Sequence, residues 1–518
     1  MAHWMNLGQN FKVNAKKFPQ KTALRDNSRS FTYPETNGRV NQLGHRLMEL
    51  GLGKGDKVAV LTDNCVEIVE LYLATAKTGI IIVPINFRLV SREVEYIVNN
   101  SDAKAIFVQA QLTTTIDPIK TALHRILPTH YVVMGEAKEG YLEYEAFITG
   151  ASVAEPDVEV KPSDTWILIY TSGTTGKPKG VIRSHESHIA FYLINAVDFG
   201  FNENDICMNV MPLCHINTTY FTFLFLYLGG SVYIHPAQFF NALEVLNIIE
   251  REKITFVSLI PTHYNMILNI DPEMRKPDVG SIRKLLCSSA PVRKSMKMAI
   301  IDFFPNSELF EAYGSTEAGI VTVLKPENQL LKPTSIGIES LGTELVKILD
   351  DDGNEVPVGA VGEIYSRGPM LFDAYYKLPE KTAQSFHGGW FSAGDMGRRD
   401  EDGYYYIVDR KDNMIITGGE NVFPSEVEEV VGSHECVFDC ACIGVPDEKW
   451  GEKIVAVVAL KEGIGKEAVT EQTIKACCRE GLAGYKRPKE IIFINPEEMP
   501  RTPTGKILHR KLREKYAG

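Results

Sequence analysis

One run of residues governs the interpretation of this chain: Tyr170-Thr-Ser-Gly-Thr-Thr-Gly-Lys-Pro-Lys-Gly-Val181. It follows the apolar stretch Trp166-Ile-Leu-Ile-Tyr170, which predicts a buried strand. Glycine lets a backbone approach a ligand closely and turn its N–H groups toward it. Hydroxyl and lysine side chains add further donors for phosphate oxygens. The run therefore predicts a loop that binds a nucleotide triphosphate.

The spacing within this loop differs from that of a P-loop. In a P-loop, four residues separate two glycines, and a lysine and a serine or threonine follow. Here two residues separate Gly173 from Gly176, and Pro178 follows Lys177. The alternative, a flexible surface loop, would not need two lysines and a proline at these spacings. The pattern therefore argues against an ordinary P-loop ATPase or kinase.

Length and composition are those of a multidomain globular protein. The 518 residues, 44% of them hydrophobic, are enough for about two to four domains. The net charge of −11 gives no sign of a nucleic-acid partner. The N-terminus lacks the pattern of a signal peptide. The longest apolar run, from Phe221 to Leu228, is too short for a transmembrane segment and predicts a buried helix.

The nine cysteines predict no disulfide framework, because they are odd in number and scattered among core-like segments. His434, Cys436, Cys440 and Cys442 superficially resemble a metal site. However, the run around them predicts a strand, whose neighbouring side chains point to opposite faces, and it lacks a zinc-type Cys-x-x-Cys pair. We therefore expect buried structural cysteines and a cytoplasmic location.

The first half of the chain alternates predicted strands and helices. Strand and helix follow one another over residues 56–62, 66–77, 79–84 and 91–99. This alternation predicts parallel βαβ units, and a second such region covers residues 206–305. From residue 335 to 406, short strands with Asp-Gly turns predict a smaller β-rich subdomain.

A new periodicity begins after the charged run Asp409-Arg-Lys-Asp-Asn413. The expected helix, two strands, helix and strand cover residues 424–432, 437–445, 454–460, 469–480 and 490–494. We therefore place a domain boundary between residues 411 and 412. The predicted fold class is α/β, with a large N-terminal domain over 1–411 and a small α+β C-terminal domain over 412–518.

Seven motifs in order resemble those of the adenylate-forming superfamily, which includes acyl-CoA synthetases, luciferases and the adenylation domains of peptide synthetases. The signature run at 170–181 comes first. The others are Met211-Pro-Leu-Cys-His215, Tyr313-Gly-Ser-Thr-Glu317, Gly362-Glu-Ile364, Trp390-Phe-Ser-Ala-Gly-Asp395, Asp409-Arg-Lys-Asp412 leading into Gly418-Gly-Glu-Asn421, and Pro500-Arg-Thr-Pro-Thr-Gly-Lys506. The resemblance covers residues 31–512. It is nearest to the crotonobetaine/carnitine, medium-chain and aromatic-acid CoA ligases.

This resemblance implies an acyl-CoA ligase with two half-reactions. A carboxylate first attacks the α-phosphate of ATP, giving an acyl-adenylate and pyrophosphate. The thiol of coenzyme A then attacks the acyl carbonyl and releases AMP. The protein has to hold anions in line and offset developing charge. The implied cradle for the β- and γ-phosphates consists of Thr171, Ser172, Gly173, Thr174, Thr175 and Lys179.

The resemblance also implies the metal and adenosine contacts. Glu317 would hold Mg²⁺ together with Thr171, and the hydroxyl of Thr316 would reach the α-phosphate. Outside the motif, such a glutamate would be a surface residue or a helix cap. The implied adenosine contacts are Tyr313, Gly314, Ser289, Ala290 and Pro291 for adenine, and Asp395 and Arg410 for the ribose or a phosphate. The family's usual Gly-Gly-Ala-Pro is replaced here by Ser288-Ser289-Ala-Pro.

The C-terminal domain of this superfamily is mobile and carries the catalytic lysine, which corresponds to Lys506. Its ammonium would bridge the carboxylate and the α-phosphate during adenylation. A rotation about a hinge at Asp412 would then withdraw Lys506 and present Gly418 and Gly419, which would line the pantetheine tunnel. The resemblance thus implies that one domain movement switches between the half-reactions.

The expected acyl pocket is polar. His215 matches the aromatic gate between the pocket and the thiol tunnel. The positions where the superfamily builds its acyl pocket are Asn217, Thr218, Thr219, Ser258, Ser288 and Ser289. They predict a short or medium acid with a second polar group. We expect Arg183 on the surface or beside the phosphates, rather than in contact with that group.

Coenzyme A is the expected acceptor, because the chain ends soon after Lys506 without a carrier domain. The positions that match coenzyme A contacts in some ligases are Arg88, Trp450, Tyr485, Arg487 and Lys489. Within the superfamily, the alternatives are a ligase that loads a separate carrier protein and an oxidative luciferase. A catalytically silent nucleotide-binding protein is the rival from another class, and the joint presence of Lys506, Glu317 and Asp395 argues against it. The resemblance is also compatible with a homodimer.

Overall fold

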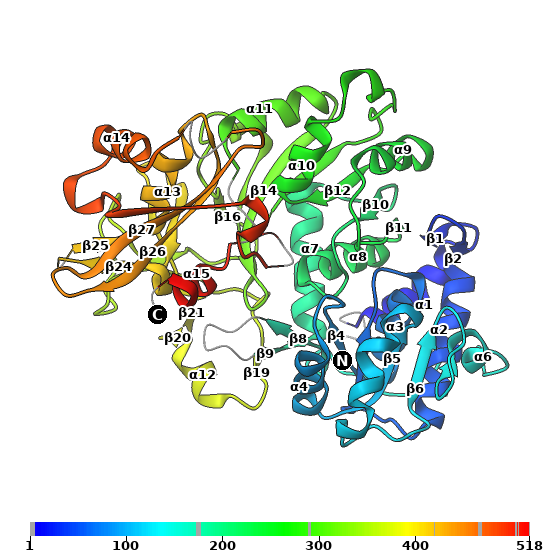
Figure 1. Ribbon diagram of the computed structural model, residues 1–518. Helices are drawn as coiled ribbons and strands as arrows, with labels where there is room; N and C mark the ends of the chain where they lie inside the picture. The colour runs from blue at the N-terminus through cyan, green and yellow to red at the C-terminus, as the bar shows by residue number, and fades with distance from the viewer. Residues whose placement is uncertain are drawn as a thin grey trace. The chain divides into compact units, whose positions relative to one another are not determined.

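The computed structural model describes residues 6–516 except 172–177, 289–291, 419, 465–468, 503–504 and 506. Two compact units make up the chain (Figure 1). Unit 1 comprises Met1–Leu345 and Ser366–Phe391, and unit 2 comprises Val346–Tyr365 and Ser392–Gly518. The mixed α/β fold class is thereby confirmed. The domain boundary between residues 411 and 412 stays a prediction.

The first sheet of unit 1 has eight strands in the order β19-β9-β8-β4-β3-β5-β6-β7. The strands are β3 (Lys57–Leu61), β4 (Ile81–Ile85), β5 (Ala103–Gln109), β6 (Tyr131–Met134), β7 (Leu142–Glu143), β8 (Thr165–Thr171), β9 (Lys179–Ser184) and β19 (Ala374–Tyr375). The six strands from β8 to β7 are parallel to their neighbours. At the other edge, β9 pairs antiparallel with β8, and β19 pairs antiparallel with β9.

The second sheet of unit 1 has nine strands in the order β16-β15-β14-β13-β12-β10-β11-β1-β2. The strands are β1 (Thr22–Arg25), β2 (Ser30–Thr32), β10 (Ile206–Asn209), β11 (Ser231–Ile234), β12 (Phe256–Leu259), β13 (Lys284–Cys287), β14 (Glu308–Ser315), β15 (Gly319–Leu324) and β16 (Ile338–Glu339). Its centre, from β14 to β1, is parallel. Both predicted βαβ regions are therefore present, one in each sheet.

Helices cover both sheets of unit 1. They are α1 (Leu7–Lys17), α2 (Tyr33–Glu49), α3 (Val66–Thr78), α4 (Ser91–Ser101), α5 (Thr113–Ile116), α6 (Tyr144–Ile148), α7 (His185–Phe199), α8 (Ile216–Leu228), α9 (Ala242–Glu252), α10 (Pro261–Leu268), α11 (Lys294–Phe303) and α12 (Pro379–Gln384). Helices α3, α7 and α8 share one apolar core with strands of both sheets, so they form the middle layer. Helix α4 covers the outer face of the first sheet, and α9 to α11 cover that of the second.

Helix α8 confirms the predicted buried helix, and it starts five residues before the apolar run. Residues 218–226 are all buried in it. No helix in the described part of the chain is long and apolar enough to cross a membrane. The position of α8 in the middle layer explains its composition, since a helix that packs against neighbours on every side is apolar all round.

Unit 2 contains two sheets. An antiparallel sheet has the order β17-β18-β22-β23, and a second sheet has the order β25-β24-β27-β26 with β28 beside β27. The strands are β17 (Lys347–Leu349), β18 (Gly362–Tyr365), β22 (Asp395–Arg399), β23 (Tyr405–Arg410), β24 (Ile415–Thr417), β25 (Glu420–Val422), β26 (Val437–Asp447), β27 (Gly451–Leu460) and β28 (Glu490–Ile494). The helices are α13 (Pro424–Gly432), α14 (Glu471–Gly481) and α15 (His509–Tyr516).

The cysteines of β26 lie as the strand pattern predicts. Cys440 and Cys442 pack in the apolar cluster that contains residues of α13 and α14. Ala441 and Ile443, the residues between and after them, belong to a different cluster that contains Leu512. The two cysteines therefore share one face of the strand, and both are buried.

A pair of glycines at helix ends gives a test of the middle layer. Gly200 ends α7 and Gly229 ends α8, both in the left-handed conformation. A Cβ atom at Gly229 would overlap the Phe18 ring, whereas at Gly200 the nearest atom is 3.8 Å away. We expect Gly229→Ala to lower the free energy of unfolding by about 3 kcal/mol and Gly200→Ala by about 1 kcal/mol. Urea titration checks this order, and equal losses would contradict it.

Two buried histidines at the start of α7 predict how stability depends on pH. The His185 ring stacks on Trp166, and burial lowers the pKa of His185 to about 3. Burial and the charge of Arg183 also lower the pKa of His188. In the unfolded chain these groups take up protons near pH 6.5. Stability present above that pH is therefore lost as the pH falls through 6.5 toward 3.

The variant His185→Phe keeps the ring stacked on Trp166 and removes one proton-binding group. We expect the free energy of unfolding to depend less on pH between 6.5 and 4, by up to about 1.4 kcal/mol per pH unit. Urea titrations at several pH values measure this slope. The matched control is His124→Gln at an exposed site, which should leave the slope unchanged. An unchanged slope for His185→Phe would exclude this histidine as a source of acid sensitivity.

Candidate active site

The motif residues of unit 1 lie where its parallel strands end. The signature loop follows β8, the residues around His215 follow β10, and Glu317 follows β14. Ligand sites in parallel sheets form at the carboxyl ends of the strands, because every crossover loop on that side starts there. The signature loop and Glu317 are far apart in sequence, and each follows the carboxyl end of a strand.

Thr171 and Lys179 face each other across the base of the signature loop. They are paired residues of the antiparallel strands β8 and β9. The predicted cradle residues Ser172, Gly173, Thr174 and Thr175 lie outside the described residues. The ammonium of Lys179 is 4.3 Å from the ring centroid of Tyr375 on β19. The strand pairing thus fixes where the loop begins and ends.

Glu317 is held by the same segment that contacts Lys179. The hydroxyl of Tyr375 donates a hydrogen bond of 2.8 Å to Oε1 of Glu317. The backbone N–H of Phe372 donates a 2.7 Å hydrogen bond to the carbonyl of Glu317. The residue is 9% exposed, so the predicted alternative of a surface glutamate is wrong. Tyr375 therefore contacts both a phosphate-loop cation and a candidate metal ligand.

Sequence reasoning missed Tyr375 as a site residue. It belongs to a strand of two residues, β19, which pairs with β9 almost 200 residues earlier. Local periodicity carries no signal for so short an edge strand. The aromatic pair Tyr375-Tyr376 after the loop at 366–373 was the available clue.

Arg183 lies in the interior, so the expected position on the surface is wrong. Its side chain is 0% exposed, and Nη1 donates to the carbonyls of Thr316 and Glu317, each at 3.1 Å. Arg183 comes from β9 of the first sheet, and the two carbonyls follow β14 of the second. The guanidinium thus joins the two sheets beside Glu317.

Tyr313 and Gly314 lie in β14, close to its antiparallel neighbour β15. A Cβ atom at Gly314 would overlap the carbonyl oxygen of Gly319, so only glycine fits there without a backbone shift. The predicted adenine contacts Ser289, Ala290 and Pro291 lie outside the described residues. The close approach of β15 therefore explains the glycine at 314 independently of any ligand.

His215 precedes α8, and burial and the charge of Arg88 lower its pKa to about 4. Its Nε2 is buried without a hydrogen-bond partner among the described residues. The same two causes, with His235, lower the pKa of His263 to about 4. Arg88 donates to the carbonyl of Ala237 at 3.2 Å. The His215 ring is therefore neutral at physiological pH, as an aromatic gate would require.

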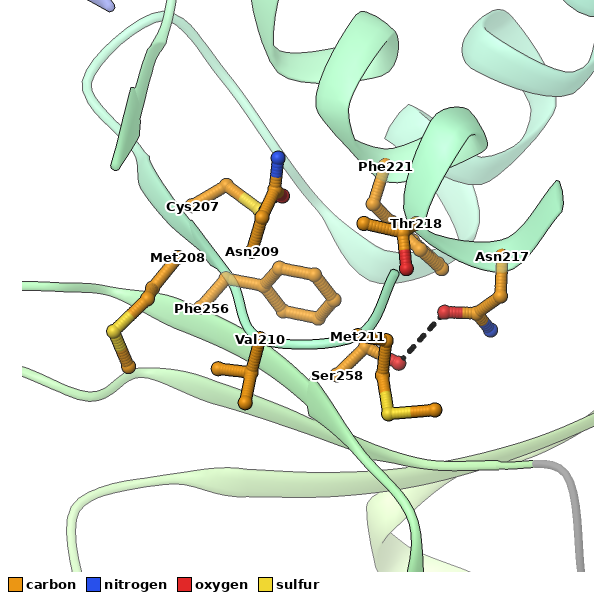
Figure 2. A pocket seen from close by; sticks show the side chains of 10 residues that line it. All are labelled: Cys207, Met208, Asn209, Val210, Met211, Asn217, Thr218, Phe221, Phe256 and Ser258. Atoms are coloured by element: carbon orange, nitrogen blue, oxygen red, sulfur yellow. Dashed lines mark hydrogen bonds between the residues drawn. The ribbon is translucent and has the colours of Figure 1, made fainter. Parts of the chain in front are cut away.

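A hollow of about 200 Å³, which includes the solvent at its mouth, lies between α8 and the ends of β10 and β12. Its lining residues are Cys207, Met208, Asn209, Val210, Met211, Asn217, Thr218, Phe221, Phe256 and Ser258. Figure 2 shows Asn217 and Thr218 on one side and the Phe256 ring opposite. Three of the residues predicted for the acyl pocket therefore line it: Asn217, Thr218 and Ser258.

Hydrogen bonds link the polar residues at this hollow. Ser258 donates to Oδ1 of Asn217 at 3.0 Å, and Nδ2 of Asn217 donates to Oγ of Ser288 at 3.3 Å. Thr218 Oγ1 is buried and has no partner within the described chain. Thr219, also predicted for the pocket, instead donates to the carbonyl of Leu213 at 2.9 Å. The hollow is thus apolar with a hydrogen-bonding rim.

Unit 2 brings Asp395 and Arg410 together. They are paired residues of β22 and β23, and Arg410 Nη1 is 3.2 Å from Asp395 Oδ1. The preceding Gly394 has a φ of +82°, which lets the chain turn directly before Asp395. The carboxylate and the guanidinium predicted to bind ribose or phosphate therefore form one ion pair at a strand end.

Trp450 packs beside Gly418. The N–H of Gly418 donates to the carbonyl of Trp450 at 2.7 Å, and a Cβ atom at Gly418 would be 3.1 Å from the indole. The ammonium groups of Lys449 and Lys489 each lie 4.9 Å from the Trp450 ring. Gly419 lies outside the described residues. An aromatic ring with two lysines is thus placed next to the predicted pantetheine glycine.

Tyr485 and Arg487 occupy different environments. Tyr485 is 41% exposed. Arg487 donates to the carbonyls of Leu482 at 2.9 Å and Arg479 at 3.0 Å, so it satisfies the C-terminal end of α14. These hydrogen bonds give Arg487 a structural role that the sequence motif did not indicate.

Lys506 lies outside the described residues, but the chain on both sides of it is described. Arg501 and Ile507 form a β-bridge, and the N–H of Leu508 donates to the carbonyl of Pro500 at 2.8 Å. Arg501 Nη1 donates to the carbonyl of Gly505 at 2.9 Å. The described residues before and after Lys506 are therefore hydrogen-bonded to each other.

Known proteins are similar to this chain in sequence and fold. The family model described as AMP-binding enzyme matches residues 11–376, and the one described as AMP-binding enzyme C-terminal domain matches residues 426–506. A long-chain-fatty-acid–CoA ligase of Mycobacterium tuberculosis is 35% identical over 99% of each chain. A feruloyl-CoA synthase of an Amycolatopsis species is 34% identical over 97% of each chain.

Solved structures agree with these relatives. The structure of an anthranilate CoA ligase in complex with anthranoyl-AMP has a TM-score of 0.87 at 30% identity, and the match covers 98% of this chain and 97% of that one. The resemblance predicted from seven motifs is therefore confirmed. The chain belongs to the AMP-binding enzyme family of the adenylate-forming superfamily, and it is an AMP-forming acid–thiol ligase.

Proposed function

We propose that this enzyme is an ATP- and Mg²⁺-dependent ligase that couples coenzyme A to a compact carboxylic acid carrying a second hydrogen-bonding group. The observation that carries the proposal is the polar rim of the hollow, formed by Asn217 and Ser258, with Ser288 hydrogen-bonded to Asn217. A fatty-acid tunnel would be apolar at this position. Lys179 at the start of β9 and Glu317 after β14 are the residues expected to bind ATP and Mg²⁺.

In the first half-reaction, the groups on unit 1 would hold the nucleotide. Lys179 would bind a phosphate oxygen, and Glu317 would take Mg²⁺, since carboxylate oxygens suit this hard cation. Bound Mg²⁺ offsets the negative charge of the phosphates. Tyr375 would orient the Glu317 carboxylate through the 2.8 Å hydrogen bond to Oε1. The hydroxyl of Thr316 would contact the α-phosphate.

In the second half-reaction, coenzyme A would be the thiol. Trp450 with Lys449 and Lys489 is suited to the adenine ring and phosphates of that cofactor, because indole stacks on adenine and ammonium binds phosphate. Arg88 is a further candidate from unit 1. The neutral His215 would separate the acyl pocket from the thiol tunnel. A cytoplasmic location and a homodimer stay predictions.

The lining of the hollow supports an acid that has both an apolar part and a hydrogen-bonding group. The rings of Phe221 and Phe256 supply apolar surface. Among the described residues, Asn217 uses one of its two N–H donors and one acceptor, so a donor and an acceptor of the amide would serve a ligand. A hydroxyl, carbonyl or carboxylate on the acid would match it.

Products identified by mass spectrometry test the proposed activity. The enzyme is incubated with ATP, Mg²⁺, coenzyme A and a panel of acids from acetate to palmitate, with aromatic, hydroxy- and dicarboxylic acids. We expect AMP together with one dominant acyl-CoA from a compact polar acid. A preference for palmitate would contradict the acid class. Acyl-adenylate without any acyl-CoA would favour the alternative, loading of a separate carrier protein.

The variant Asn217→Leu tests the polar rim. It preserves side-chain volume and leaves Ser258 and Ser288 without their shared partner. We expect kcat/KM for the preferred acid to fall roughly 10- to 100-fold relative to its unsubstituted analogue, since unpaired buried polar groups cost about 1–3 kcal/mol. The matched control is Met208→Leu in the same hollow, which should leave the ratio unchanged. If Asn217→Leu leaves this ratio of kcat/KM values unchanged, the polar rim does not select the substrate.

The variant Lys506→Ala tests the proposed catalytic lysine. We expect ATP–pyrophosphate exchange to fall by about 100-fold or more, while the reaction of preformed acyl-adenylate with coenzyme A changes little. The reason is that Lys506 would act only on the charge that develops during adenylation. The control is Lys511→Ala, an exposed lysine five residues later. Equal loss of both half-reactions would contradict this role.

A further inference from the structure

Arg183 is one of the largest fully buried side chains of the protein. It lies in β9, four residues after Lys179, and it pairs with Ile167 of β8. Its Nη1 atom carries two N–H groups, and two carbonyl acceptors lie 3.1 Å away, those of Thr316 and Glu317. One guanidinium nitrogen therefore holds two consecutive peptide groups of another sheet.

The rest of the guanidinium makes no hydrogen bond to the part of the chain that the structure describes. Nε and Nη2 are buried and have no hydrogen-bond partner among the described residues. The Tyr220 ring of α8 lies 5.4 Å from the guanidinium carbon. Buried donors without partners destabilise the folded state. A methionine of similar length would avoid that loss, so packing alone does not account for an arginine here.

The charge of Arg183 acts on several neighbours. It contributes to lowering the pKa of His188, which is thereby neutral, and it opposes the increase that burial causes in the pKa of Asp373. Burial also lowers the pKa of His185, so the two histidines of this cluster add no positive charge at neutral pH. The cationic guanidinium therefore lies beside the backbone that carries Glu317 and near a second carboxyl group, Asp373.

The location of the two carbonyls indicates what the arginine does. Thr316 and Glu317 are the residues proposed to contact the α-phosphate and Mg²⁺, and Lys179 begins the strand that contains Arg183. The signature loop and the Glu317 turn come from different sheets, so their spacing is not set by one β-ladder. The guanidinium links β9, the strand that follows the loop, directly to the turn. A shift of about 1 Å between reacting groups can reduce a rate about 100-fold.

We propose that Arg183 is a positioning residue for adenylation, which fixes the Thr316–Glu317 backbone relative to the signature strand through Nη1. The inference rests on the proposed function, because it assigns Arg183 an effect on the ATP-dependent half-reaction. A purely structural role would lower stability and leave the ratio of the two half-reactions unchanged. The separation of those two effects decides between the roles.

The experiment uses the full-length enzyme with Arg183→Met and Arg183→Lys. Methionine removes both the charge and the hydrogen bonds, and lysine keeps the charge without the planar arrangement of donors. The matched control is Lys77→Met, another buried cation of unit 1, whose ammonium contacts Glu155, Asn37 and Asn41 far from the motifs in sequence. All variants are compared by thermal unfolding.

Three readouts separate the roles: ATP–pyrophosphate exchange, consumption of preformed acyl-adenylate by coenzyme A, and calorimetric binding of ATP with Mg²⁺. We expect exchange to fall roughly 100-fold in Arg183→Met and roughly tenfold in Arg183→Lys, with weaker ATP–Mg²⁺ binding in both. The thioester step should change less than about threefold in either variant. Lys77→Met should lower stability without changing the ratio of the half-reactions.

Three results would overturn the inference: unchanged exchange in a folded Arg183→Met, an equal loss of both half-reactions, or the same loss in Lys77→Met. If Arg183→Met does not fold, unchanged ATP–pyrophosphate exchange in Arg183→Lys would overturn the inference. Failure of the proposed function would be recognised separately, because the wild-type enzyme would then form no acyl-adenylate with any acid in the panel.

Discussion

The direction of the strands is the constraint on which the site of unit 1 depends. Parallel neighbours need crossover helices, and each crossover returns the chain to the same edge of the sheet. The loops after β8, β10, β13 and β14 therefore all begin at carboxyl ends. Polar residues can accumulate in those loops without disturbing the apolar strands, which explains why the motifs are separated by long buried segments.

The site of unit 1 also depends on the edge strand β19, which comes almost 200 residues after its partner β9 in the sequence. The segment of β19 reaches β9 and supplies Tyr375, whose hydroxyl contacts Glu317 and whose ring lies under the ammonium of Lys179. Arg183 makes a second connection, from β9 of the same sheet to the turn after β14. The first sheet is thus joined to the second by two side chains beside Glu317.

These connections mark the limit of what the sequence could predict. Strand and helix periodicity located α3, α4, α13 and β28 to within about two residues, because burial on one face or both leaves a local pattern. The motifs located Glu317 and Asp395 through family resemblance. The burial of Arg183 and the contact of Tyr375 depend on which sheet packs against which strand, and neither has a local signature. An arginine in a strand therefore looks like a surface residue until the second sheet is placed over it.

Helix α8 contacts both the hollow and the buried Arg183. Asn217, Thr218 and Phe221 line the hollow on one side of the helix, as Figure 2 shows, and Tyr220 packs against Arg183 and His188 on another. A change that widens the hollow by moving α8 would also move the ring that covers the guanidinium. Substitutions on its two sides should therefore not act additively, since residues that share a packed element are energetically coupled. Under the proposed function, the choice of acid and the geometry of adenylation would depend on the same turn of helix.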